Sequence, residues 1–212
     1  MLHLEGFDFD LTAKNSDVPP VVLLHGSGGR ETDWTDFAQH IAPRSTCFSV
    51  RGPIAWEQGF TFFRRNPDRS LNYAELATGS ERLCVFLDAI SKRYGFAQPP
   101  ILAGYSNGAI IAAAVVCRRR EFTSGAILLR PQSPDPQTPF PNLQHYPVLI
   151  LAGANERRKK GDAQVLVDQF RVAQADVSYH ELNAAHGWEQ TGLDRSLSKE
   201  WFAERFRRLR RV

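Results

Sequence analysis

A serine between two glycines is the residue whose surroundings most clearly indicate chemistry in this chain. The segment GYSNG at 104–108 follows the apolar run at 100–103 and precedes the Ala-rich run at 109–116. A G-x-S-x-G between a strand and a helix forms a nucleophile elbow, a strained turn that exposes the serine hydroxyl. The helix N-terminus behind it offers free N–H groups to a developing oxyanion. The pattern predicts Ser106 as a nucleophile; an idle serine in a tight turn is the alternative.

A glycine-rich loop earlier in the chain complements this elbow. HGSGG at 25–29 ends the apolar run VVLL, and it has neither the Lys-Ser/Thr of a phosphate-binding loop nor the spacing G-x-G-x-x-G, which disfavours nucleotide binding. Such a loop supplies one oxyanion N–H, and the residue after the nucleophile supplies the other. We therefore expect Ser27 and Asn107 to form the oxyanion hole. His25 is expected to brace this loop rather than to act directly in catalysis, and it is also a candidate for substrate binding.

The general base and its acid partner should follow the serine along the chain. In folds built around such an elbow the order is serine, acid, histidine. His186 lies in AAHGW, after the last expected strand, and is the predicted base. The acid is expected on the loop after PVLILAG, where Glu156 is the first choice and Asp162, beyond the basic run at 157–160, is the alternative. A displaced acid is a third reading. Glutamate can hold the tautomer of the histidine and stabilise the imidazolium, as aspartate does.

Strands and helices that alternate along the chain would position these residues. Continuous apolar runs indicate strands buried on both faces of a parallel sheet, and helical periodicity between them indicates helices on both faces. Strands of this buried kind are expected at 21–25, 46–50, 100–105, 125–130 and 147–153. Polar and apolar residues alternate at 3–11 and 176–182, which predicts half-exposed strands nearer the edge of the sheet. Helices are expected at 34–42, 73–95, 107–119, 162–173 and 198–211, and a Pro-rich loop at 131–147. The sequence thus predicts one α/β domain over residues 1–212 with a mostly parallel central sheet.

Composition excludes several other classes of protein. Of the 212 residues, 42% are hydrophobic and 23% are charged, which is typical of globular proteins rather than disordered or collagen-like chains. The net charge of +3 is too small to indicate nucleic acid as a partner. The longest apolar stretch, at 109–117, is shorter than the roughly 20 residues of a membrane span. Neither a signal peptide nor a disulfide framework is evident, so we expect a cytoplasmic protein with reduced cysteines. No metal or organic cofactor is expected, because the His and Cys residues lack zinc-like spacing.

Several motifs spread along the chain carry a family resemblance. LLHGSGG, VRGPI, FFRR, GYSNGA, LLRP, LILAG and AAHGW occur in this order between residues 23 and 188. The chain resembles the phospholipase/carboxylesterase family of small bacterial serine hydrolases, within the α/β-hydrolase superfamily and close to its dienelactone-hydrolase-like members. The resemblance implies an α/β-hydrolase fold without a cap domain, esterase activity, Ser106 as nucleophile, His186 as base and a homodimer. It also implies an aspartate in a G-x-x-D-P setting, where this chain has Glu156 without the proline.

The substrate pocket is expected from loops, because 212 residues leave little room for a lid. Phe60, Phe63 and Trp188 suit an apolar or aromatic group, and Arg130 suits an acidic one, although each also fits a purely structural role. The predicted reaction is hydrolysis of short-chain or aromatic carboxylic esters through an acyl-enzyme. A thioesterase or lysophospholipase-type deacylase would use the same triad, and a non-catalytic binding module is the remaining alternative.

Overall fold

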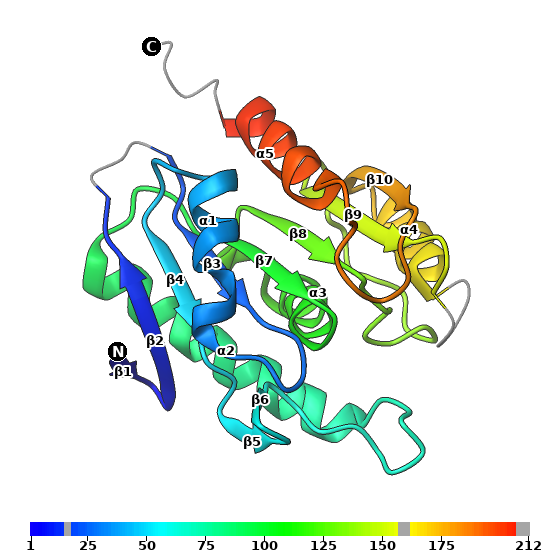
Figure 1. Ribbon diagram of the computed structural model, residues 1–212, viewed down its shortest axis with the longest axis horizontal. Helices are drawn as coiled ribbons and strands as arrows, with labels where there is room; N and C mark the ends of the chain where they lie inside the picture. Colours follow the sequence, from blue (N-terminus) through cyan, green and yellow to red (C-terminus); the bar gives the residue numbers. More distant parts are fainter. Residues whose placement is uncertain (15–17, 157–161, 207–212) are drawn as a thin grey trace.

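A twisted sheet forms the centre of the computed structural model, which describes residues 1–14, 18–156 and 162–206 (Figure 1). In these ranges eight strands form the sheet, in the order β1-β2-β4-β3-β7-β8-β9-β10. The six strands from β4 to β10 are parallel, and β1 and β2 continue the sheet in antiparallel pairs. Their bounds are β1 (Leu2–Leu4), β2 (Phe7–Thr12), β3 (Val21–Leu24), β4 (Cys47–Val50), β7 (Ile101–Tyr105), β8 (Gly125–Leu129), β9 (Pro147–Gly153) and β10 (Asp176–Leu182).

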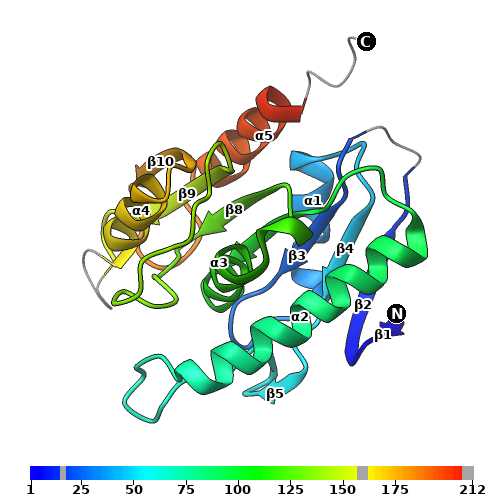
Figure 2. The same cartoon turned by 180° about the vertical axis from the view of Figure 1, so that it is seen from behind.

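Helices cover both faces of this sheet. Helices α1 and α5 lie on the face towards the viewer in Figure 1, and α2, α3 and α4 lie on the other face, seen in Figure 2. Strand β3 shows why both faces must be covered, because Val22 and Leu24 pack on one side and Val21 and Leu23 on the other. The helices are α1 (Thr35–Ile41), α2 (Tyr73–Tyr94), α3 (Asn107–Arg119), α4 (Asp162–Val172) and α5 (Leu193–Phe206). Two short 3-10 turns, η1 (Glu31–Trp34) and η2 (Arg120–Phe122), and a hairpin of β5 (Ile54–Trp56) and β6 (Gly59–Thr61) complete the elements.

The described residues form an α/β fold with a mostly parallel central sheet and helices on both faces, as the sequence predicted. The runs expected at 147–153 and 176–182 form β9 and β10 with the same bounds. Helix α2 begins and ends as expected, because the side chain of Asn72 accepts a hydrogen bond from the Glu75 N–H and Gly95 takes the left-handed conformation after the last turn. The Pro-rich segment is a loop between β8 and β9.

Two expectations about the elements need correction, and one hairpin was missed. The strand expected at 3–11 is two strands, because Glu5 and Gly6 both take positive φ values, 47° and 77°, and turn the chain between β1 and β2. Helix α5 begins at Leu193 rather than at 198, and the part expected after Phe206 lies outside the described residues. The hairpin of β5 and β6 was not predicted.

Five of the six parallel strands, namely β3, β7, β8, β9 and β10, carry the candidate residues where they end at one edge of the sheet. The segments that follow them carry, in turn, the glycine-rich loop, the serine elbow, Arg130, Glu156 and His186. Carboxyl ends of parallel strands are the usual position of ligand and reaction sites in open α/β sheets. The topology thus brings residues that are far apart in sequence to one edge.

Candidate active site

The serine elbow is the sharp turn between β7 and α3. Ser106 has φ 50° and ψ −110°, in the left-handed half of the map that residues with a side chain rarely adopt. The two glycines allow this turn, since a Cβ on Gly104 would lie 2.3 Å from the Gly108 carbonyl oxygen. A Cβ on Gly108 would lie 2.0 Å from the carbonyl oxygen of Leu24 in β3. Strand, helix and neighbouring strand therefore approach so closely that no larger residue fits at either position.

A chain of two hydrogen bonds extends from the serine. The Oγ of Ser106 lies 2.7 Å from Nε2 of His186, and Nδ1 of His186 lies 2.5 Å from Oε2 of Glu156. The side chains of His186 and Glu156 are 28% and 22% exposed, so the pair is partly shielded from water. An imidazole in this position can take the proton of the hydroxyl, and a carboxylate behind it fixes the tautomer and stabilises the imidazolium.

The structure separates the two candidate acids. Glu156 occupies the position beside Nδ1 of His186 that the acid of a triad must fill. Asp162 is the first residue of α4, and it lines a cavity of about 270 Å³ together with Gln132 and Ser133. The geometry favours Glu156. The basic run at 157–160 lies outside the described residues.

The two expected oxyanion donors belong to segments that touch each other. Asn107 is the first residue of α3, so its backbone N–H has no carbonyl one turn earlier to which it can donate. Its buried side chain joins the elbow to the segment after β6, because Oδ1 accepts from the Phe62 N–H at 3.0 Å and Nδ2 donates to the Phe63 carbonyl at 3.1 Å. Ser27 lies in the loop after β3, with its Oγ 3.3 Å from Oγ1 of Thr61. Their role as donors stays a prediction.

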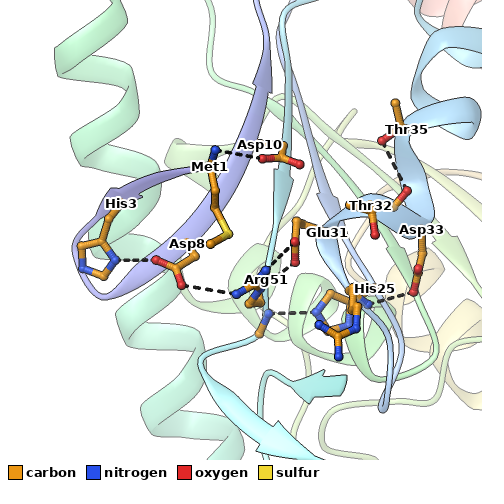
Figure 3. Close-up of polar contacts among 12 residues, drawn as sticks. Met1, His3, Asp8, Asp10, His25, Glu31, Thr32, Asp33, Thr35 and Arg51 are labelled. Carbon is orange, nitrogen blue, oxygen red and sulfur yellow. Dashed lines mark hydrogen bonds and ion pairs between the residues drawn. The ribbon is translucent and has the colours of Figure 1, made fainter. Parts of the chain in front are cut away.

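The loop that carries Ser27 is fixed from two sides. Its Gly28 N–H donates to the Phe60 carbonyl at 2.9 Å, and the Phe60 N–H donates back to Gly29 at 3.0 Å. Behind the loop lies the polar network of Figure 3, in which Arg51 donates two hydrogen bonds, of 2.7 and 2.6 Å, to the buried carboxylate of Glu31. This hydrogen bonding holds the pKa of Glu31 below its usual value. The loop is thus positioned before any substrate binds.

His25 braces this loop. Its prediction as a substrate-binding residue is therefore wrong. The side chain is 1% exposed, and its Nε2 accepts a hydrogen bond from the Gly52 N–H at 2.9 Å (Figure 3). Its Nδ1 lies 2.7 Å from the Gly26 carbonyl oxygen, so Nδ1 carries the proton. Burial lowers the pKa of His25, which keeps the ring neutral.

Two of the three aromatic candidates remain as possible substrate contacts. Phe63 is 1% exposed and packs in the core beneath α2 and α3, so its prediction as a substrate contact is wrong. Phe60 is half-buried with its ring 4.6 Å from the guanidinium carbon of Arg51. Trp188 is 45% exposed and stacks on Tyr105, with ring centroids 5.4 Å apart, beside the loop of His186. For Phe60 and Trp188 a role in binding stays a prediction.

The prediction that Arg130 contacts the substrate is also wrong. Its side chain is 0% exposed and forms an ion pair with Asp194, so it is not available to a substrate in solution. Sequence reasoning missed Asp194 and also Tyr105, whose hydroxyl donates to the His186 carbonyl oxygen. Tyr105 lies next to the nucleophile, which is a signal that could have been used; Asp194 in the first turn of the last helix carries no such signal.

The described residues contain neither a membrane-spanning helix nor a group of metal ligands. Every helix within the ranges 1–14, 18–156 and 162–206 is too short or too polar to span a bilayer. In the same ranges no three His, Cys, Asp or Glu side chains gather as metal ligands would. The absence of a cofactor stays a prediction.

The chain is similar to a protein named as a hydrolase and to solved structures of carboxylesterases. No family model matches the chain. The chain is 28% identical over 186 residues to MhqD of Bacillus subtilis (strain 168), a protein named as a candidate hydrolase, and the match covers 87% of this chain and 92% of that protein. A carboxylesterase of Bacillus cereus has a similar structure, with a TM-score of 0.87, 29% identity and coverage of 94% of this chain and 95% of that one. A carboxylesterase of Mesorhizobium loti has a TM-score of 0.86 at 27% identity, over 93% and 95% of the two chains.

Proposed function

Because the chain is an esterase-type hydrolase with the α/β-hydrolase fold, we propose that it hydrolyses carboxylic esters through an acyl-enzyme on Ser106. One observation carries this proposal, namely the continuous hydrogen-bonded series from Ser106 Oγ through His186 to Glu156, with separations of 2.7 and 2.5 Å. The separation between Ser106 and His186 lies in the range that proton transfer from a nucleophile to its base requires.

The reaction follows from the roles of these groups. His186 removes the proton of Ser106 as the oxygen attacks the ester carbonyl carbon, and the negative charge moves to the carbonyl oxygen. The backbone N–H groups of Ser27 and Asn107 stabilise that charge. The tetrahedral intermediate collapses, the alcohol leaves with the proton from His186, and Ser106 keeps the acyl group. Water, activated by the same imidazole, then releases the acid.

Small or aromatic esters are the substrates that the surroundings of His186 favour. The exposed ring of Trp188, stacked on Tyr105, provides an apolar surface beside the base. Strand β8 is followed by a loop rather than by a helical cap, so loops must enclose the substrate. A homodimer and a cytoplasmic location stay predictions from the sequence and its resemblance.

The test is covalent labelling of the folded protein with a fluorophosphonate, followed by intact mass measurement and peptide mapping. We expect one adduct, on Ser106, and none in Ser106→Ala with an unchanged circular dichroism spectrum. Matched panels of acyl esters and acyl thioesters then identify the class of substrate. A folded wild-type protein that takes up no label and hydrolyses no ester would favour the binding-module alternative, whereas faster turnover of thioesters would favour the deacylase.

A further inference from the structure

A buried ion pair lies beneath the loop that carries His186. Arg130 follows β8, and Asp194 lies in the first turn of α5. The guanidinium donates to both carboxylate oxygens, at 2.8 and 2.9 Å, and the two side chains are 0% and 1% exposed. Removing two charges from water costs about as much free energy as their attraction returns, so stability alone does not account for such a pair.

The remaining hydrogen bonds of this pair go to the loop after β10. Nε of Arg130 donates to the carbonyl oxygen of Gly187, the residue that follows His186, at 3.1 Å. Oδ2 of Asp194 accepts from the Glu189 N–H at 2.7 Å. Both partners of the ion pair thus hold the main chain of the loop within three residues of the base.

The same arginine joins this loop to the rest of the site. One of its terminal nitrogens donates to the Leu151 carbonyl in β9, the strand that leads to Glu156, at 3.2 Å. The carbonyl oxygen of Leu129, the residue before Arg130, accepts a hydrogen bond from the backbone N–H of Ser106 at 2.9 Å. Arg130 therefore stands where the strands that lead to the serine and the acid meet the loop of the base.

We propose that Arg130 and Asp194 form a clamp that positions His186 for proton transfer from Ser106. The loop needs such support because most of it, including Gly187 and Trp188, is exposed to water. A planar guanidinium suits this task, since it can satisfy both carboxylate oxygens and still donate through Nε to a carbonyl. The proposal rests on the proposed function for its catalytic part, whereas the attachment of the loop can be measured without activity.

The decisive variant removes both charges. Replacing only one partner leaves an unpaired buried charge, whereas an apolar pair such as Arg130→Met with Asp194→Leu leaves none and is expected to recover stability. Arg130→Lys is the second variant, because lysine keeps the charge but not the planar fork. Phe170→Leu is the control: Phe170 is fully buried in the core on the opposite face of the sheet, and its truncation lowers stability without touching the loop.

Hydrogen exchange of the full chain tests the attachment of the loop. In the double variant we expect the amides of residues 187–189 to exchange at least about tenfold faster than in the wild type, with β7 unchanged. In Phe170→Leu the loop should exchange as in the wild type. Unchanged protection of the loop in the folded double variant, or in Arg130→Lys if the double variant does not fold, overturns the clamp whatever the activity.

Kinetics with p-nitrophenyl acetate test the effect on His186. We expect kcat of the double variant to fall about 10- to 100-fold with KM within about threefold, even where thermal stability is regained. Arg130→Lys should also lose kcat, and Phe170→Leu should keep it. A double variant with a loosened loop and wild-type kcat overturns the positioning role. If the wild type itself shows neither labelling nor turnover, the proposed function fails, and the exchange experiment still decides whether the pair holds the loop.

Discussion

Glu156→Gln is the most direct test of the proposed triad. Glutamine keeps the size of the side chain but removes the negative charge next to Nδ1 of His186, which lies 2.5 Å from the carboxylate. The amide can also present an N–H to the ring and so stabilise the tautomer that cannot take the proton of Ser106. The substitution thus barely changes the volume of the side chain, but it removes a full negative charge beside His186.

The size of the effect follows from the geometry. For charge centres about 4 Å apart, the attraction between imidazolium and carboxylate is about 4 kcal/mol at an effective dielectric of about 20. His186 and Glu156 are 28% and 22% exposed, so water weakens this attraction. A value of about 2 to 3 kcal/mol, between the buried and surface limits, corresponds to a loss of about 30- to 160-fold in kcat.

The assay is steady-state hydrolysis of p-nitrophenyl acetate, with Asp162→Asn as the matched control. We expect Glu156→Gln to lose kcat by the stated factor with little change in KM, and Asp162→Asn to stay within about twofold of the wild type, because Asp162 begins α4 and Glu156 fills the position at Nδ1. The reverse result, with Asp162→Asn impaired and Glu156→Gln active, would refute this reasoning and move the acid to Asp162.

Three further predictions concern the elbow and its loop. Ser106→Gly and Ser106→Ala should both be inactive, but urea unfolding should show the glycine variant to be more stable by about 0.5–1 kcal/mol, because only glycine relieves the φ of 50°; equal stabilities would argue against strain at the elbow. Gly108→Ala should lose at least about 3 kcal/mol of stability in the same assay, since its Cβ would lie 2.0 Å from the Leu24 carbonyl oxygen, and a near-normal urea midpoint would contradict this close approach. Burial lowers the pKa of His25 from 6.5, so the unfolded chain binds this proton more readily and stability should fall as pH drops below 6.5 towards the folded pKa; an NMR titration midpoint of His25 at or above 6.5 would contradict the neutral brace.

The parallel part of the fold could be predicted because its signals are local. Strands buried on both faces must be apolar at every position, and turn residues bound them, so 147–153 was found with its ends. The partly exposed edge strand 176–182 was found from its alternation of polar and apolar residues. The hairpin of β1 and β2 was missed for a local reason as well. The apolar residues stand at even positions up to Leu4 and at odd positions from Phe7, so the alternation breaks at Glu5 and Gly6, where both residues take positive φ values, and the prediction did not use this break.

The order and spacing of the candidate triad could be predicted because topology fixes them. Parallel strands place their following loops at one edge, so a serine, an acid and a histidine after successive strands can meet. The partners of individual side chains could not be predicted in this way. Arg130 was predicted as a substrate contact, because the sequence does not distinguish an arginine that faces a pocket from one that is buried beneath it. Its partner Asp194 lies 64 residues later, so the ion pair leaves no local signal either.

Asn107 is placed to act through its main chain and its side chain at once, if its predicted role in the oxyanion hole holds. The elbow places its N–H at the start of α3, where no carbonyl of the helix can accept it, so this N–H is the one we expect to bind an oxyanion. Its buried amide binds the main chain at Phe62 and Phe63, which leads back through β6 to the loop of Ser27. The two expected donors are therefore joined through protein hydrogen bonds, and a hole assembled in advance needs no reorganisation when charge develops. The motif G-x-S-x-G leaves this position open, so only the folded structure reveals why asparagine suits it.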